Sequence, residues 1–544
     1  MLQPSTLLRS GALALGIMIS GLALQPPLRA QARAVDAVDL DMVSRIRQEG
    51  LQRSQVMANL DHLTDRIGPR LTNSAAYARA SQWTRTRLAE WGLSNVHEEQ
   101  VDDLGRGWEF NRASVLMLDP RPMPLHALPQ AWTPGTNGPV EGEVVLAKLD
   151  SPADLDKWKG KLRGKVVFTD AARPYKPGEQ PDFHRHDEKS LEDLIAFPVP
   201  QQRSDAERAE DARRFKERLA FVPRRNQFLV DEGVVASVGI SSWDNGIVRV
   251  MGGGSRKGGE SDGVPSFVMI AEHYNTVLRA LDRKAPVRLR LDSDARYTTA
   301  QSGPGYNVIA EIPGSGPQKN EIVMIGAHLD SWHAGSGAND NGAGVAVMME
   351  AMRILRAVGA RPNRTIRIGL WTGEEQGLLG SRAHVEKHYA RYPTPSDPAE
   401  AALPVSMRSN KGTLQRLPGY ERFSVYFNLD NGSGKIRGVY GQENLAAAPI
   451  FQAWLEPFND LGARQVTQRN TGSTDHIAFD AVGLPGFQFV QDRLDYFSNV
   501  HHTHLDVQDH ASADDLKQAA TIVAAFAYNA SMMRSRFPRK HFVD

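Results

Sequence analysis

The chain has no cysteine among its 544 residues. Disulfide bonds, cysteine-ligated zinc fingers and thiol nucleophiles are therefore excluded. An excess of one charge is also missing, because 64 Lys and Arg residues stand against 63 Asp and Glu residues, a net charge of +1. Such a balance provides no broad electrostatic field for holding nucleic acid or anionic lipid, so neither is predicted as a partner.

Long apolar runs are scarce, and the most conspicuous one is residues 11–24 (GALALGIMISGLAL). It follows the basic residue Arg9 and precedes Ala30-Gln31-Ala32, which fits the cleavage pattern of an export signal. We predict a signal peptide over residues 1–32 and bacterial-type export to the periplasm or the medium. An uncleaved N-terminal anchor is the alternative. No later segment reaches the ~18 consecutive apolar residues of a membrane span, so none is expected in the mature chain.

The remaining chain is longer than one hydrophobic core usually supports, and its texture changes along its length. Residues 33–129 show apolar residues at helical spacing and are predicted to be the N-terminal helical part of the main domain. Residues 130–296 carry short β-rich runs punctuated by Gly and Pro, which indicates an inserted β-rich domain. Residues 297–544 alternate strands and helices. This alternation is typical of an α/β fold with a mostly parallel, mixed sheet flanked by helices.

Two segments within these domains look irregular. Residues 175–226 are highly charged and broken by proline, and we interpret them as a solvated helix rather than a binding element. Residues 392–421 are rich in Pro, Ala and Ser and read as a surface loop.

Acidic and histidine side chains follow each predicted strand of residues 297–544. Open α/β sheets bind ligands beyond the carboxyl ends of their strands, so these side chains are expected to meet at one edge. Nitrogen and oxygen ligands of this kind suit zinc, and their number is sufficient for two ions. Each piece alone is common in structural roles, but their joint placement favours a metal site. The set comprises His328, Asp330, Asp340, Glu374, Glu375, Asp430 and the cluster at 501–506.

Other catalytic signatures are missing from the sequence. There is no H-E-x-x-H helix of the single-zinc kind and no complete phosphate-binding glycine loop. There is also no G-x-S-x-G elbow, which argues against a serine hydrolase.

Residues 321–381 (EIVMIGAHLDSW…GANDNGAG…RTIRIGLWTGEEQGLLGS) and residues 500–506 (VHHTHLD) resemble the catalytic segment of the di-zinc exopeptidase family. This family includes secreted zinc aminopeptidases and a carboxypeptidase Q-like branch, to which these phrases are most similar. Residues 60–74 (LDHLTDRIGPRLTNS) resemble the family's opening helices. GKVVFTD and GVPSFVMI within residues 130–296 resemble strands of a protease-associated domain.

The resemblance implies two Zn²⁺ ions and a ligand for each position. His328 and Asp430 would hold one ion, and Glu375 and His502 the other. Asp340 would bridge the two. The family's H-[ST]-x-x-D pattern selects His502 rather than His501 or His504, although Val507 departs from the Thr that usually follows.

The same resemblance implies the roles of the remaining residues. Glu374 would be the general base for a hydroxide shared by the two ions. Asp330 would orient His328 by accepting its second ring N–H. Residues 473–476 (STDH) resemble the family's substrate-side segment. The implied activity is hydrolysis of peptide bonds in small peptides by an exported, zinc-dependent exopeptidase.

Two other classes share this fold and bear on the interpretation. One is a non-catalytic receptor or binding relative, and the other is a single-zinc, glutaminyl cyclase-like acyltransferase. The complete set of ligands and base argues against both. Aminopeptidase, carboxypeptidase and dipeptidase specificity stay open, as does a homodimer. The inserted domain is expected to cover the substrate cleft, with a partner-binding module as its alternative.

Overall fold

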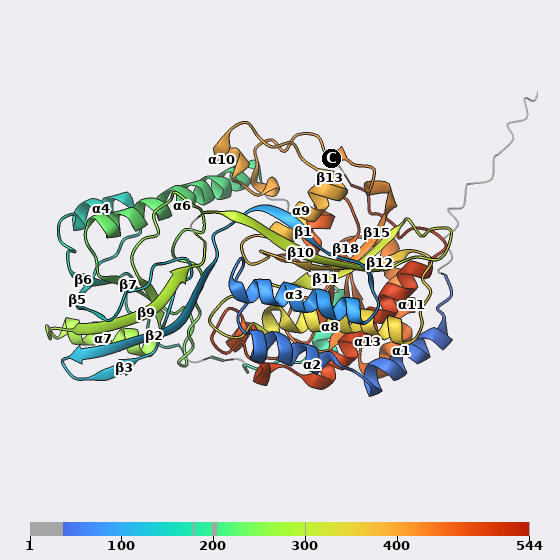
Figure 1. Ribbon diagram of the computed structural model, residues 1–544, viewed down its shortest axis with the longest axis horizontal. Coiled ribbons are helices and arrows are strands. Elements are labelled where there is room, and N and C mark those ends of the chain that lie inside the picture. Colours follow the sequence, from blue (N-terminus) through green and yellow to red (C-terminus); the bar gives the residue numbers. More distant parts are fainter. Residues whose placement is uncertain (1–35, 177, 180, 198–203, 300, 543–544) are drawn as a thin grey trace, which may run out of the picture. The chain divides into compact units, whose positions relative to one another are not determined.

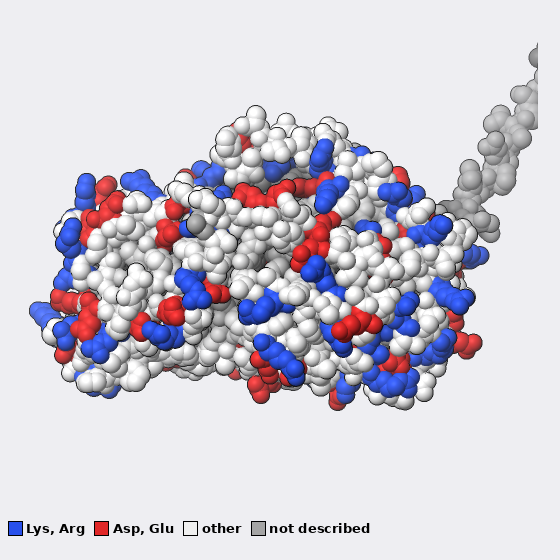
Figure 2. All heavy atoms as spheres, viewed as in Figure 1, with Lys and Arg blue, Asp and Glu red and all other residues white. Residues whose placement is uncertain are grey.

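The computed structural model describes residues 36–176, 178–179, 181–197, 204–299 and 301–542, and the predicted signal peptide lies outside these ranges. Across the described ranges, no helix combines the length and the apolar character that a membrane crossing requires. On the face seen in Figure 2, basic and acidic side chains are interspersed rather than gathered by sign. This mixture accords with the balanced composition of the chain.

The larger domain is built on an eight-stranded mixed sheet (Figure 1). The four strands at its centre run parallel, in the order β12, β11, β15 and β18. Antiparallel strands extend it on either side through β10 and β16. In spatial order the strands are β1 (Ser94–Gly105), β10 (Gly303–Ile312), β12 (Thr365–Trp371), β11 (Ile322–His328), β15 (Phe423–Asn428), β18 (Gly486–Gln491), β16 (Ile436–Tyr440) and β17 (Gln465–Thr467).

Helices cover both faces of this sheet (Figure 1). On one face α8 and α13 pack against each other and against β11, and α1 and α2 pack against these two helices. Helix α3 packs against β1 and β10. On the other face α9 and α12 pack against β12, β15 and β18. The helices are α1 (Leu40–Gln52), α2 (Val56–Asp61), α3 (Ala75–Glu90), α8 (Ala343–Ala357), α9 (Leu379–His388), α10 (Pro398–Ala401), α11 (Ala448–Leu455), α12 (His476–Asp480) and α13 (Ala513–Met532). The predicted α/β fold with a mixed sheet and flanking helices is confirmed.

The central elements β11 and α13 are rich in apolar residues because they are buried. All but the first residue of β11 (IVMIGAH) are buried, as expected for a parallel strand covered on both faces. Helix α13 is buried along almost its whole length because it packs against α8, α1 and the sheet at once. Asp514 and Asp515 in its first turn suit the positive end of the helix dipole.

A second eight-stranded sheet is formed by residues 108–297. Its strands β5 to β8 run parallel, and α7 packs near the apolar core that they build. In spatial order they are β3 (Met123–Leu125), β2 (Trp108–Asp119), β9 (Arg288–Tyr297), β5 (Val140–Leu146), β6 (Lys165–Phe168), β7 (Ala236–Ile240), β8 (Ser266–Met269) and β4 (Ala127–Pro129). The associated helices are α4 (Pro152–Trp158), α5 (Glu188–Ile195), α6 (Asp205–Asp231) and α7 (Ala271–Asp282).

The predicted boundary at residue 130 needs correction. Residues 94–129 are strands rather than helices: β1 joins the main sheet, and β2, β3 and β4 join the second sheet. The second sheet therefore starts at Trp108, because β2 pairs along its length with β9 at the far end of the segment. The helical spacing of apolar residues predicted the structure correctly only up to the end of α3.

The charged segment 175–226 between β6 and β7, called the excursion below, contacts the main domain as well as solvent. Arg185 forms ion pairs with Asp492 at 3.0 Å and with Asp515 at 2.7 Å. Lys216 of α6 pairs with Glu400 in α10 at 2.7 Å. The expectation of a merely solvated helix is thus incomplete, because both ends of the excursion are attached to the main domain.

We predict that Gly50→Ala destabilises the fold by about 1–3 kcal/mol. A Cβ at this position of α1 would overlap Oγ1 of Thr521 and lie 3.0 Å from Cδ1 of Ile354, both in the buried α8–α13 layer. Gly303→Ala is the matched control, since no atom lies within 4 Å of its added Cβ. Unfolding midpoints in urea measure both, and equal midpoints for the two variants would contradict the prediction.

Candidate metal centre

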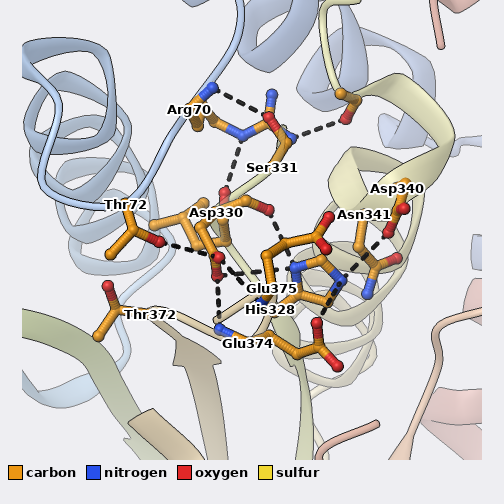
Figure 3. A network of polar contacts seen from close by, with 12 residues as sticks. Arg70, Thr72, His328, Asp330, Ser331, Asp340, Asn341, Thr372, Glu374 and Glu375 are labelled. Atoms are coloured by element: carbon orange, nitrogen blue, oxygen red, sulfur yellow. Dashed lines mark hydrogen bonds and ion pairs between the residues drawn. The ribbon is translucent and has the colours of Figure 1, made fainter. Parts of the chain in front are cut away.

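The carboxyl ends of three neighbouring strands converge on one buried site. Figure 3 shows the part of it that contains His328, Asp340, Glu374 and Glu375. His328 is the last residue of β11, Glu374 and Glu375 follow β12 in the turn that leads to α9, and Asp430 follows β15. Asp340 lies in an irregular helical turn, Ala338–Gly342, that begins α8. The rule that predicted a site at these strand ends therefore holds for this sheet.

The site consists of two groups of ligand-type atoms that share the carboxylate of Asp340. On one side Nε2 of His328 lies 3.3 Å from Oδ1 of Asp340 and 3.4 Å from Oδ1 of Asp430. On the other side Nε2 of His502 lies 3.2 Å from Oδ2 of Asp340 and 3.0 Å from Oε2 of Glu375. The structure thus brings together all five residues predicted as ligands.

Several of these atoms are buried without a hydrogen-bond partner. They are Nε2 of His328, Oδ2 of Asp340, Oε1 of Glu375 and Oδ1 of Asp430. A buried polar atom without a partner is unfavourable, and buried groups of this kind are normally paired or bound to a metal. Imidazole nitrogens and carboxylate oxygens facing one another form a donor set that fits zinc. The residues present therefore fit the predicted metal.

The electrostatics of the site show an excess of negative charge. Burial raises the pKa of Glu374 well above its ordinary value, against the opposing charge of His328. Burial also raises the pKa of Glu375 to about 7, against His502. Burial alone would lower the pKa of His328, but the carboxylates of Asp430 and Glu374 outweigh it and raise that pKa. A cation bound between these groups would relieve the repulsion among the carboxylates.

Asp330 has a different partner from the one that we predicted. Nδ1 of His328 lies 2.9 Å from the main-chain carbonyl oxygen of Asp330 and 3.6 Å from its carboxylate. The carboxylate instead accepts from the hydroxyl of Thr72 at 3.0 Å and from the backbone N–H groups of Glu374 at 3.2 Å and Glu375 at 3.4 Å (Figure 3). Asp330 therefore fixes the turn that carries the two glutamates, and its backbone orients the histidine.

Asp506 and Arg70 position the turn that carries Asp340, and the sequence reasoning assigned neither a role. The carboxylate of Asp506 accepts from the backbone N–H groups of Asn339 at 2.6 Å and of Asp340 at 3.3 Å. The fully buried guanidinium of Arg70 donates to the carbonyl oxygens of Leu329 at 2.8 Å and Gly337 at 2.7 Å (Figure 3). Asp506 is the last residue of the H-[ST]-x-x-D pattern, from which only the histidine was assigned a role.

The histidine cluster separates into three environments. His502 contacts Asp340 and Glu375, whereas Nε2 of His501 lies 3.8 Å from Asp340. His504 turns away, and its Nδ1 accepts from the backbone N–H of Val248 at 3.1 Å. His502 has a φ of +63°, which is uncommon for a residue with a side chain and is often found at functional sites. The geometry thus favours His502 as the ligand.

A residue of the second domain also reaches this centre. Nη2 of Arg249 lies 3.2 Å from Nδ1 of His502, and the backbone N–H of Val250 donates to the carbonyl oxygen of His502 at 3.3 Å. Arg249 pairs with Thr503 in an antiparallel bridge. Nothing in the local sequence signals this contact, because the two segments are about 250 residues apart.

Two further clusters lie outside the predicted set. Both carboxylate oxygens of Asp475, in the segment 473–476, are buried without a hydrogen-bond partner, and burial raises its pKa to about 7. Behind the sheet, Glu99 accepts from His384 at 2.7 Å and from His388 at 2.5 Å. Because each Glu99 oxygen already bonds to a histidine, that group is a satisfied hydrogen-bond network.

The part of the chain that carries this centre matches a known family. Residues 307–527 match the model of Peptidase family M28. Carboxypeptidase Q of Mus musculus is 28% identical over 492 residues, which cover 90% of this chain and 88% of that protein. Aminopeptidase YwaD of Bacillus subtilis (strain 168) is 28% identical over 220 residues, 39% of this chain and 41% of that protein.

Two solved structures have a similar fold. A peptidase M28 precursor from Shewanella amazonensis SB2B superposes with a TM-score of 0.62 at 23% identity, covering 92% of this chain and 99% of that one. A zinc aminopeptidase from Bacillus subtilis superposes with a TM-score of 0.52 at 17% identity, covering 92% of this chain and 97% of that one. At these identities the likeness concerns the fold.

We predict that Asp330→Asn lowers metal affinity or turnover by about 10- to 100-fold. An amide keeps one acceptor oxygen but loses the negative charge, so it cannot hold both glutamate N–H groups equally well. Competition with a chelating dye measures the affinity. Thr72→Val removes only the hydroxyl donor and should change it by less than about tenfold. Wild-type affinity and turnover in Asp330→Asn would refute this role.

Proposed function

We propose that this chain, a metallo-exopeptidase whose residues 307–527 match Peptidase family M28, releases residues from small peptides at a two-zinc centre. The observation that carries this proposal is the carboxylate of Asp340, which His328 and His502 contact through different oxygens. The names of the relatives support it, because they include a carboxypeptidase and an aminopeptidase. A structure of similar fold is described as a zinc aminopeptidase.

Each zinc position would be held by three of the five residues. His328 and Asp430 would hold one ion, His502 and Glu375 the other, and Asp340 would contribute one oxygen to each. When bound, two such ions polarise the scissile carbonyl and lower the pKa of the attacking water. The four unpartnered buried atoms among these residues support this arrangement.

Glu374 would serve as the general base. Its Oε2 lies 4.0 Å from Nε2 of His328, farther than the nearest oxygens of Asp340 and Asp430, so its carboxylate adjoins that group of ligand atoms. From that place it can accept a proton from the attacking water and return it to the leaving amine. Asp330 would hold this carboxylate in position through the backbone N–H of Glu374.

The second domain would cover the cleft in the manner of a protease-associated domain. The contact between Arg249 and His502 supports this, because it places a segment of the second domain against a proposed zinc ligand. Residues 1–32 would direct export, with cleavage before Arg33. Short, unblocked peptides are the proposed substrates.

We predict that Glu374→Gln retains both zinc ions and loses about 10²- to 10⁴-fold in kcat. The amide preserves the shape of the side chain but cannot take up the proton. Elemental analysis of the dialysed protein counts the zinc, and a dipeptide assay gives kcat. Glu90→Gln, at an exposed glutamate that ends α3 and lies outside the cavity lining, is the control for loss of charge. Full activity in Glu374→Gln would rule out the assigned role.

A second prediction concerns the metal and the ends of the substrate. The mature chain, from Arg33, should release amino acids from a free dipeptide, and a chelator should abolish this release until zinc is restored. N-acetylated and C-amidated dipeptides then separate the specificities. If only N-acetylation abolishes release of amino acids, the chain is an aminopeptidase. If only C-amidation abolishes it, the chain is a carboxypeptidase. If either modification abolishes it, the chain is a dipeptidase. No release from any form by a zinc-loaded protein would favour a non-catalytic binding relative.

A further inference from the structure

A cavity of about 950 Å³ adjoins the metal centre. Gln376 and Gly377, which directly follow Glu375, form part of its lining. Its other walls come from α6, from α9 and from the segment 401–408. The cavity is large enough for a short peptide, and the excursion of the second domain forms one side of it.

The lining of this cavity is basic, although the chain as a whole is balanced. Six Lys or Arg residues line it against two Glu residues, whereas the complete chain has 64 basic and 63 acidic residues. A concave surface lined by one sign of charge concentrates ligands of the opposite sign. The six are Arg218, Arg256, Lys257, Arg382, Arg391 and Arg408.

Arg382 differs from Arg256 and Arg408, the other two half-buried arginines of the cavity lining. Arg408 donates to the carbonyl oxygens of Ala401 and Leu403, and Arg256 donates to that of Leu104. The half-buried guanidinium of Arg382 has no hydrogen bond or ion pair with any described residue, including Glu386 one turn further along α9. Donors left free in a partly dry site favour an anionic ligand.

The position of Arg382 relates it to the chemistry. It lies in the first turns of α9, the helix that starts directly after the Glu374–Glu375 turn. Burial lowers the pKa of Arg382, and the charge of Glu386, ahead of those of Asp475 and Glu374, acts in the opposite direction. A ligand bound to Arg382 would lie in the cavity whose wall includes Gln376, the residue that follows Glu375.

We propose that Arg382 binds a carboxylate of the peptide substrate and thereby makes this cavity the subsite for an anionic group. The planar guanidinium can donate two parallel hydrogen bonds to a carboxylate. That carboxylate is either the C-terminal group of a short peptide or an acidic side chain, and the two share the same chemistry. This inference rests on the proposed peptidase function and adds the residue that selects the substrate.

Three peptides test the proposal and separate the two sources of carboxylate. Ala-Ala carries only the terminal carboxylate, Ala-Glu amide carries only a side-chain carboxylate, and Ala-Ala amide carries neither. Arg382→Gln should lower kcat/KM by about 10- to 100-fold for the peptide whose carboxylate is bound, chiefly through KM. It should leave Ala-Ala amide unchanged. Arg382→Lys keeps the positive charge but cannot donate two parallel hydrogen bonds, so it should recover part of the lost kcat/KM.

Lys387→Gln is the matched control, because it removes a positive charge from the exposed side of the same helix and lies outside the cavity lining. It should leave all three peptides unaffected. An equal loss for all three peptides in Arg382→Gln would indicate a structural role and overturn the proposal. Wild-type kcat/KM of Arg382→Gln for all three peptides would also overturn the proposal.

A binding measurement keeps this test independent of turnover. Calorimetric titration of zinc-loaded Glu374→Gln protein with Ala-Ala, Ala-Glu amide and Ala-Ala amide should show the same dependence on Arg382. If the wild-type chain cleaves no peptide, the proposed peptidase function fails, and this titration still decides whether Arg382 binds a carboxylate. Equal affinities with and without the arginine would overturn the inference alone.

Discussion

The carboxylate of Asp340 connects two histidines that come from different ends of the catalytic sequence. Its Oδ1 faces His328 and its Oδ2 faces His502. Burial would raise the pKa of Asp340, but its close contacts with these two histidines outweigh burial and hold the pKa well below its ordinary value. The turn that carries Asp340 is fixed by Asp506, only four residues beyond His502. A shift of this turn would therefore disturb both halves of the site together.

The sequence indicates where these side chains gather because the signal is local. Ligand residues lie at the ends of apolar strands, and parallel strands place their carboxyl ends at one edge. The strands β2 and β4 escaped prediction because they pair with β9 and β8, which lie more than 130 residues further along the chain. Strand β3 pairs in turn with β2. The role of Asp330 was misassigned for a different reason. Residue type reveals a carboxylate, but it cannot reveal that the backbone carbonyl of the same residue takes the histidine N–H.

The second domain is coupled to the centre through backbone pairing rather than through a flexible contact. His504 donates from its backbone N–H to Val248 at 3.1 Å, and Val250 donates to His502 at 3.3 Å. These bonds enclose Arg249, whose guanidinium faces the same histidine. A residue whose backbone is bonded to another domain cannot move without that domain. Residues 248–250 thus help to hold His502 in place.

The clustering of carboxylates at this edge also relates metal binding to stability. Each buried polar atom left unpartnered costs about 1–3 kcal/mol, and a domain has a net stability of about 5–15 kcal/mol. Four such atoms, on His328, Asp340, Glu375 and Asp430, therefore weigh heavily against folding unless something pairs with them. Bonds from Asp506 and Arg70 hold the turn that carries one of them, Asp340. Cations bound in the two groups would pair with these atoms, so metal binding would also favour the folded state.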